Sequence, residues 1–318
     1  MVIDILLIIV GIVLVLWGAD RLTDGAVAIA QRLNIPEMVI GLTIVALGTS
    51  MPELCISMVS ALKGTSDLAV GNVVGSNIFN TLLIVGVAAM VAPIAILRST
   101  VWKDMPWSML AGVLLAVLCL DGRVSRLDAL LLFAIFLVFM GYTLYRAKRE
   151  KPEATMEAHE ARTPLAATIL VVLGLSCLVL GSNVFVDAAT RVARALHVSD
   201  AVIGLTIVAG GTSLPELATS VVAARKGQSA IAIGNVIGSN VYNVLLIIGL
   251  TGLICPMELQ GITLIDYAVM TLGMAMLWCF SYTRLLVERW EGAALTAVFA
   301  TYMAWLLYNA VVLSPATA

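Results

Sequence analysis

The stretch Gly41-Leu-Thr-Ile-Val-Ala-Leu-Gly-Thr-Ser-Met-Pro-Glu53-Leu returns 163 positions later as Gly204-Leu-Thr-Ile-Val-Ala-Gly-Gly-Thr-Ser-Leu-Pro-Glu216-Leu. Only two of the fourteen positions differ. The surrounding sequence is apolar enough to span a membrane, where a carboxylate costs at least about 2.5–3.5 kcal/mol on insertion scales and usually marks function. Two such glutamates in equivalent repeats predict one central cation site built from two halves.

A second repeated motif predicts further parts of this site. Gly71-Asn-Val-Val-Gly-Ser-Asn-Ile-Phe-Asn80 pairs, at the same offset of 163, with Gly234-Asn-Val-Ile-Gly-Ser-Asn-Val-Tyr-Asn243. In each copy, Asn, Ser and Asn recur every four residues and form a polar stripe on an apolar helix. We interpret one group as cavity-lining: Ser76, Ser239, Asn80 and Asn243. The alternative role is contact between helices, which we assign to Asn72, Asn77, Asn235 and Asn240.

Composition places the chain in the membrane. It is 61% hydrophobic and 12% charged, with a mean hydropathy of +1.05, far from the roughly 25% charged residues of soluble domains. About 20 apolar residues are needed to cross the hydrocarbon core. The sequence predicts ten spans, at about residues 3–22, 38–61, 68–92, 105–120, 127–146, 165–186, 201–223, 230–254, 265–284 and 293–313.

The main hydrophilic segment falls between the fifth and sixth of these spans. We therefore predict a first repeat at 1–146 (motif 41–80), a linker at 147–163 and a second repeat at 164–318 (motif 204–243). Five spans in each half would turn the second half upside-down, giving an all-α membrane protein of ten transmembrane helices in two inverted five-helix repeats. The thirteen-to-five distribution of Lys and Arg favours both termini outside and the linker in the cytoplasm.

The residues just before each glutamate supply oxygen ligands. Thr49 and Ser50 precede Glu53 by four and three residues and share its helix face; Thr212 and Ser213 repeat the arrangement before Glu216. A proline within a helix also removes a backbone hydrogen bond. Oxygen from carboxylate, hydroxyl and carbonyl groups suits a hard cation such as Ca²⁺. The alternative is a proline kink in which the hydroxyls bond back into the helix.

Other functional classes find little support in the sequence. It has no Gly-x-x-x-x-Gly-Lys-Ser/Thr, His-Glu-x-x-His or Gly-x-Ser-x-Gly motif, and we expect neither an enzyme nor a bound cofactor. Asp24 and Asp187 are equivalent under the offset, but we expect each to lie near a span end, solvated or paired with Arg21 or Arg191. The partners that we expect are transported ions and the lipid bilayer, with no nucleic acid and no obligate protein partner.

The doubled motifs closely resemble the alpha repeats of the calcium/cation antiporter superfamily, and the chain looks like its prokaryotic sodium/calcium exchangers. The resemblance implies ion sites among the second, third, seventh and eighth helices. It implies sliding of the first and sixth helices, which Gly18 and Gly181 would suit. It implies Ca²⁺ on Glu53 and Glu216, aided by backbone oxygens of Thr49 and Thr212. It also implies Na⁺ sites at Ala46, Thr49, Ser50, Ser76, Ala209, Thr212, Ser213 and Ser239.

One position departs from the family pattern. Members of the superfamily often carry aspartate where this chain has Asn243, so the central polar ring here contains two carboxylates, not three. Potassium co-transport is therefore not expected. The sequence predicts a secondary active antiporter exchanging Ca²⁺ for Na⁺, in a prokaryotic inner membrane. A cation/proton antiporter of the same superfamily and a passive cation channel are the alternatives.

Overall fold

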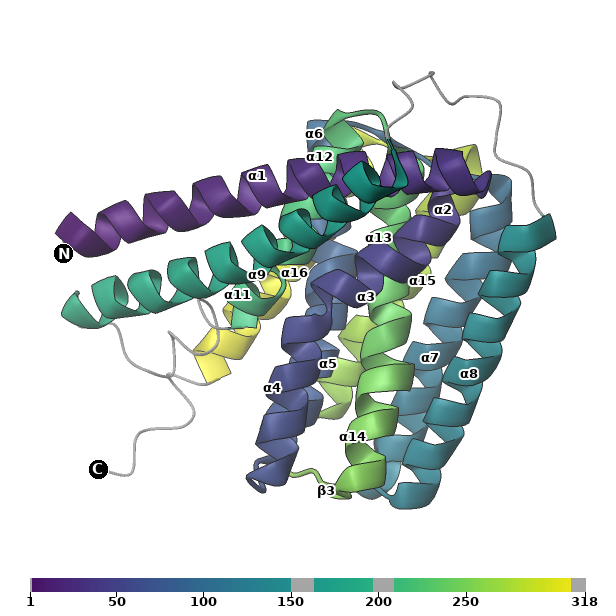
Figure 1. The fold of residues 1–318 in the computed structure, drawn as a ribbon. Helices are drawn as coiled ribbons and strands as arrows, with labels where there is room; N and C mark the ends of the chain where they lie inside the picture. The colour runs from purple at the N-terminus through teal and green to yellow at the C-terminus, as the bar shows by residue number, and fades with distance from the viewer. Residues whose placement is uncertain (1, 150–162, 197–208, 310–318) are drawn as a thin grey trace.

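The computed structural model describes residues 2–149, 163–196 and 209–309, and nearly all of them are helical (Figure 1). The elements before the linker are α1 Val2–Leu33, α2 Glu37–Ile40, the π-helical η1 Gly41–Val45, α3 Ala46–Thr49, α4 Met51–Leu62, α5 Ser66–Ile78, the π-helical η2 Phe79–Ile84, α6 Val85–Val91, β1 Ile94–Ala95, the π-helical η3 Thr100–Asp104, α7 Met105–Leu118, the 3₁₀ turn η4 Cys119–Asp121, β2 Arg123–Val124 and α8 Arg126–Arg149.

The elements after the linker follow the same plan. They are α9 Pro164–Ala195, α11 Ala209–Thr212, α12 Leu214–Arg225, α13 Ser229–Val241, the π-helical η6 Tyr242–Ile248, α14 Gly249–Ile254, β3 Met257–Glu258, α15 Leu264–Arg284, β4 Leu286–Val287 and α16 Arg289–Tyr308. The bounds of α12 and α13 lie 163 positions after those of α4 and α5.

The short strands and turns also occur in equivalent pairs. β1 pairs with β4 antiparallel, and β2 pairs with β3 antiparallel. Adding 163 to the residue numbers of β1 gives those of β3, and adding 163 to those of β2 gives those of β4. Gly64 and Gly227, the equivalent turns after α4 and α12, both have positive φ, 76° and 75°. Glycine adopts this conformation without steric cost. The sequence repeat is therefore also a repeat of local structure.

Seven helices are long and apolar enough to cross a membrane, or eight when the bent segment formed by Glu37–Thr49 and Met51–Leu62 is counted as one span. Ten spans were predicted. Two predicted spans remain. The span at 201–223 begins outside the described residues. The span at 293–313 overlaps α16, which starts with Arg289, Trp290 and Glu291 and is not among the helices that are long and apolar enough to cross. α8 continues through Arg149, so the first three residues of the predicted linker, 147–149, are helical.

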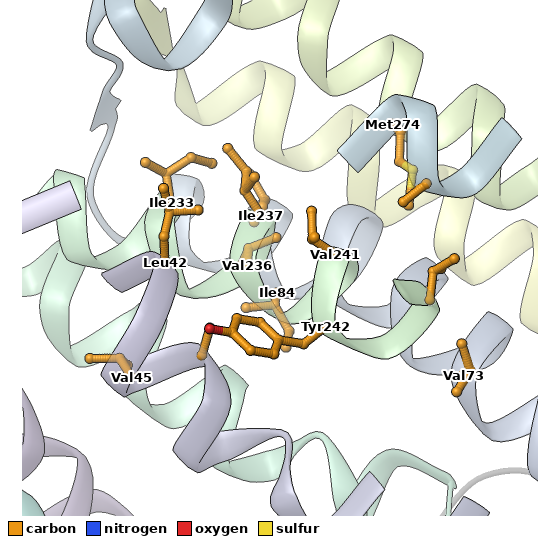
Figure 2. Close-up of a cluster of buried hydrophobic side chains, with 14 of the residues drawn as sticks. Leu42, Val45, Val73, Ile84, Ile233, Val236, Ile237, Val241, Tyr242 and Met274 are labelled. Carbon is orange, nitrogen blue, oxygen red and sulfur yellow. The ribbon is translucent and has the colours of Figure 1, made fainter. Parts of the chain in front are cut away.

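The motif helices occupy the centre of the bundle. Within the most apolar window of each span, 94% of the residues are buried in Ser229–Ile254 and 72% in Ser66–Val91, against 22% in α1. Figure 2 shows part of this core, in which Ile84 lies beside the ring of Tyr242. The outer helices present apolar side chains outward, as lipid contact requires.

α1 and α9 form a closely packed antiparallel pair (Figure 1). Glycines make the approach possible: a Cβ on Gly18 would lie 2.8 Å from the Gly174 carbonyl oxygen, and a Cβ on Gly181 would lie 2.9 Å from that of Gly11. Such small residues let the backbones of membrane helices touch. The two helices are equivalent in the repeat and run in opposite directions.

The charges near the ends of these helices form pairs that the sequence did not predict. Asp24 lies 2.7 Å from Lys226 rather than beside Arg21, and Arg191 lies 2.7 Å from Asp4 rather than beside Asp187. Residues adjacent in sequence were the natural candidates, but the partners come from elements far along the chain. Packing between helices, not sequence proximity, decides these contacts.

Candidate cation site

The helix that carries each glutamate is broken just before it. α3 ends at Thr49, Ser50 is non-helical (φ −84°, ψ 6°), and α4 begins at Met51 after a bend of 46°. Ser213, before α12, has nearly the same geometry (φ −89°, ψ 7°). The expected proline kink is thus the start of a new helix, where proline fits the first turn. Glu53 also lies in that first turn, where the helix dipole favours a carboxylate.

The two glutamates are held by the opposite half of the chain. Ser213 Oγ donates a hydrogen bond to Glu53 Oε1 at 3.2 Å, and Ser50 Oγ donates one to Glu216 Oε1 at 3.1 Å. Both glutamates are buried, each with 1% of its surface exposed. The broken turns of the two repeats therefore meet at one place, and each orients the carboxylate of the other.

Several buried oxygens around this meeting point have no hydrogen-bond partner. One carboxylate oxygen of each glutamate is unpartnered, and so are three oxygens of the second motif; the set is Glu53 Oε2, Glu216 Oε2, Asn80 Oδ1, Asn243 Oδ1 and Ser239 Oγ. Leaving a buried polar atom unsatisfied costs about 1–3 kcal/mol, so these five oxygens are available to a ligand. Because all five atoms are oxygen, the ligand that fits them is a hard cation.

The amides of Asn80 and Asn243 are oriented by a second pair of asparagines. Asn80 Nδ2 donates to Asn240 Oδ1 at 3.3 Å, and Asn243 Nδ2 donates to Asn77 Oδ1 at 3.1 Å. With the nitrogen engaged, the oxygen of each side chain remains available. The division between cavity-lining and helix-joining asparagines stays a prediction, since these hydrogen bonds join all four residues across the repeats.

Asn72 and Asn235 form hydrogen bonds with the helices that carry the two glutamates. Asn72 Nδ2 donates to the Glu53 carbonyl oxygen at 3.2 Å and to Ser57 Oγ at 3.0 Å. Asn235 makes the same bonds with the carbonyl of Glu216 at 3.3 Å and with Ser220 Oγ at 3.0 Å. Sequence reasoning missed the two serines, although they are exactly one repeat apart and the offset alone could have revealed them.

The remaining predicted ligands have differing contacts. Thr49 Oγ1 donates to Asn235 Oδ1 at 3.1 Å, and Ser76 Oγ lies 3.4 Å from Ser213 Oγ. The Ala46 carbonyl accepts the backbone N–H of Ser50 at 3.0 Å. Of the others, Thr212 is buried, and Ala209 is the first described residue of its helix, so the turn before it lies outside the described residues.

The charge of the site comes from two carboxylates alone. Within residues 2–149, 163–196 and 209–309, no group of three or more His, Cys, Asp or Glu side chains could hold a metal ion. Two negative charges amid neutral oxygens suit an ion that binds and leaves.

Comparison with known proteins agrees with this geometry. The family model described as "Sodium/calcium exchanger protein" matches residues 3–145 and again residues 166–308. The chain belongs to the sodium/calcium exchanger family. The two matches in this exchanger-family chain start 163 positions apart and end 163 positions apart, so each half of the protein by itself carries the family's pattern.

Relatives of this family member cover nearly its whole length. It is 37% identical to the putative antiporter CaxA of Alkalimonas amylolytica, over 97% of this chain and 100% of that protein. It is 33% identical to the sodium/calcium exchanger MaX1 of Methanosarcina acetivorans, over 96% and 99% of the two chains. The inner membrane protein YrbG of Escherichia coli is 37% identical, over 84% and 85%.

A solved structure of the sodium-calcium exchanger NCX_Mj has the same fold as this exchanger-family chain. The TM-score is 0.85 at 29% identity, over 96% of this chain and 99% of that one. The NCX_Mj crystals in this comparison were soaked with Na⁺ and Ca²⁺. The chain is thus a multi-pass, all-helical membrane protein of the exchanger family, and transport rather than catalysis is the family's activity.

Proposed function

We propose that this protein is a secondary active antiporter that exchanges Ca²⁺ for Na⁺ at the site between the two broken helices. The observation that carries the proposal is the group of five unpartnered buried oxygens, two of which belong to Glu53 and Glu216. The proposed ligand set adds Ser76 and the serine, threonine and alanine positions of the first motif: Ala46, Thr49, Ser50, Ala209, Thr212 and Ser213.

Charge balance supports exchange of these two ions. Two ionised glutamates neutralise one Ca²⁺, so the calcium-loaded site can be enclosed without a net buried charge, which would be costly. Na⁺ ions can occupy the same oxygens in its place. Because both cations need the same carboxylates, binding of one displaces the other, and each is carried only when the other has left.

The proposed architecture has ten spans in two inverted repeats, divided as residues 1–146, 147–163 and 164–318. Two observations support inversion: α1 and α9 occupy equivalent positions and run antiparallel, and the family model matches twice at the offset of the repeat. We place the protein in a prokaryotic inner membrane, with both termini outside and the linker in the cytoplasm, from the distribution of Lys and Arg.

A proton as the counter-ion is the second candidate. One feature favours it: the two glutamates that share the site are both buried, and each could be neutralised by a proton instead of a cation. A cation/proton antiporter would use the same carboxylates but would respond to a pH gradient and not to Na⁺.

Uptake of radiolabelled Ca²⁺ into sodium-loaded proteoliposomes tests the proposal. We expect uptake that requires internal Na⁺ and that is lost in Glu53→Gln. A sodium-free interior and an imposed proton gradient are the two controls. Uptake driven by the proton gradient alone would support the second candidate, and uptake under neither gradient would refute Ca²⁺ as the substrate.

A further inference from the structure

Lys226 ties the core of the protein to α1. Its Nζ lies 2.5 Å from Asp20 Oδ1 and 2.7 Å from Asp24 Oδ1, and it also donates to the Asp20 carbonyl at 3.2 Å. Lys226 directly follows α12, whereas the two aspartates lie one turn apart on α1. The contact therefore joins the end of α12 to α1, where the two helices pack together (Figure 1).

The repeat contains a second set of these residues at the opposite end of the core. Subtracting 163 from Lys226 gives Lys63, and adding 163 to Asp24 gives Asp187; Asp20 corresponds to Asn183. Lys63 and Asp187 are both exposed, and neither forms an ion pair with any described residue. The same two charges that meet at one end of the molecule are therefore separate at the other.

The helix faces beside these charges differ in the same way. Met51, Cys55, Val59 and Leu62 form one stripe along α4, and all four are exposed, Val59 at 47% and Leu62 at 62%. The equivalent stripe on α12 is covered where α1 packs on it: Ala218, the counterpart of Cys55, is 7% exposed. α9 makes no comparable packing with α4 in the described part of the chain.

Because α1 and α9 pack closely on each other, the pair can lie against α12 or against α4, but not against both at once. Their backbones touch at Gly11, Gly18, Gly174 and Gly181, so the pair shifts as one body more easily than it separates. While α1 lies on α12, α9 is held away from the lower end of α4 (Figure 1). A shift of the pair that placed α9 on α4 would bring Asp187 towards Lys63 and draw Asp24 away from Lys226.

We propose that Lys226–Asp24 and Lys63–Asp187 are alternative latches, each of which holds the α1–α9 pair at one end of the core and closes that end. The inference rests on the antiport proposed above, because it assigns the residues that stabilise each state of the exchange cycle. The latches are unequal: Lys226 has two carboxylate partners, whereas Lys63 would have Asp187 and the neutral Asn183. The present arrangement is therefore the favoured one at rest.

Paired cysteines in the full-length protein test the proposal, in a background from which the five native cysteines are removed. One variant is Asp24→Cys with Lys226→Cys, and the other is Lys63→Cys with Asp187→Cys. A short, reducible bifunctional thiol reagent should link the first pair in the resting protein. It should link the second pair once Ca²⁺ and Na⁺ are supplied on opposite sides. Either link should arrest exchange until it is reduced.

Charge changes outside the linked pairs test whether the two latches differ in strength. Asp20→Asn should speed linking of positions 63 and 187, and Asn183→Asp should slow linking of positions 24 and 226. Each effect should be about two- to fivefold, the range of a partly exposed ion pair. Asp128→Asn, a carboxylate at the start of α8, is the matched control and should change neither rate.

The possible outcomes distinguish a failure of the latch proposal from a failure of the proposed Ca²⁺/Na⁺ exchange. Failure of positions 63 and 187 to link during turnover, while positions 24 and 226 do link, would overturn the proposal even if Ca²⁺ exchange is normal. Exchange that continues after either link forms would also overturn it. Conversely, linking at both ends together with no exchange of Ca²⁺ for Na⁺ would leave the latches standing and refute the proposed function.

Discussion

Ser50 and Glu216 lie 166 positions apart in the chain and are joined by a hydrogen bond of 3.1 Å between the serine hydroxyl and the carboxylate. The mirror bond joins Ser213 to Glu53 at 3.2 Å. Neither half of the protein can therefore position its own glutamate alone. The candidate site lies where the two broken helices meet, so it needs both of them.

Replacement of either glutamate by glutamine should abolish Ca²⁺ uptake. Glu53→Gln and Glu216→Gln keep the shape of the side chain but remove one of the two charges that balance the ion, at a cost of about 3–5 kcal/mol for a buried partner. We expect a drop in apparent affinity of about 100-fold or more, measured by uptake into proteoliposomes. Glu258→Gln, on an exposed strand, is the control, and near-normal uptake in either site variant would disprove the assignment.

Removal of the serine hydroxyls should weaken binding less severely. In Ser50→Ala and Ser213→Ala each carboxylate loses its donor from the other repeat, and hydrogen bonds to charged groups contribute about 1.5–3 kcal/mol. Apparent affinity for Ca²⁺ should fall by about tenfold or more in each. Ser281→Ala, a buried serine of α15, should leave affinity unchanged. Equal behaviour of all three variants would show that the cross-repeat bonds have no role in binding.

A third carboxylate at the site should make transport depend on pH. Asn243 donates to Asn77 Oδ1; an ionised aspartate cannot donate, whereas a protonated one can. Asn243→Asp should therefore differ most from wild type at high pH and approach it as the pH falls, in Ca²⁺ uptake measured across a pH series. Asn80→Asp is the matched variant in the other repeat. A profile identical to wild type would place position 243 outside the ion pathway.

A methyl group at Gly48 should disturb the contact between the broken helix and α9. Its Cβ would lie 2.5 Å from Cδ2 of Leu175, and overpacking of this kind costs about 1–3 kcal/mol. Gly48→Ala should lower the thermal midpoint of unfolding and slow exchange. Leu175→Ala in the same chain should restore both. An additive effect of the two changes, in place of a rescue, would mean that the two residues do not compete for space.

Asparagine side chains illustrate how far the sequence could predict the site. The offset of 163 and the spacing of four placed Asn80 and Asn243 on the polar stripes of the repeated helices, because spacing on a helix decides which residues share a face, and we predicted that these two residues line the cavity. The hydrogen bonds that leave the oxygens of Asn80 and Asn243 free are invisible in the sequence. They cross between the repeats, and their partners depend on how two helices pack.

The sequence by itself determined the membrane class, the duplication and the two glutamates, because hydropathy, repeat spacing and buried charge are all local properties of the chain. It also treated the two halves as equals, since their motifs are nearly identical. Only the tertiary structure distinguishes them: α1 packs on α12 while one stripe of α4 stays exposed, and Lys226 is paired whereas Lys63 forms no ion pair with a described residue. Packing between helices decides these differences, and it is not a local property of either repeated motif.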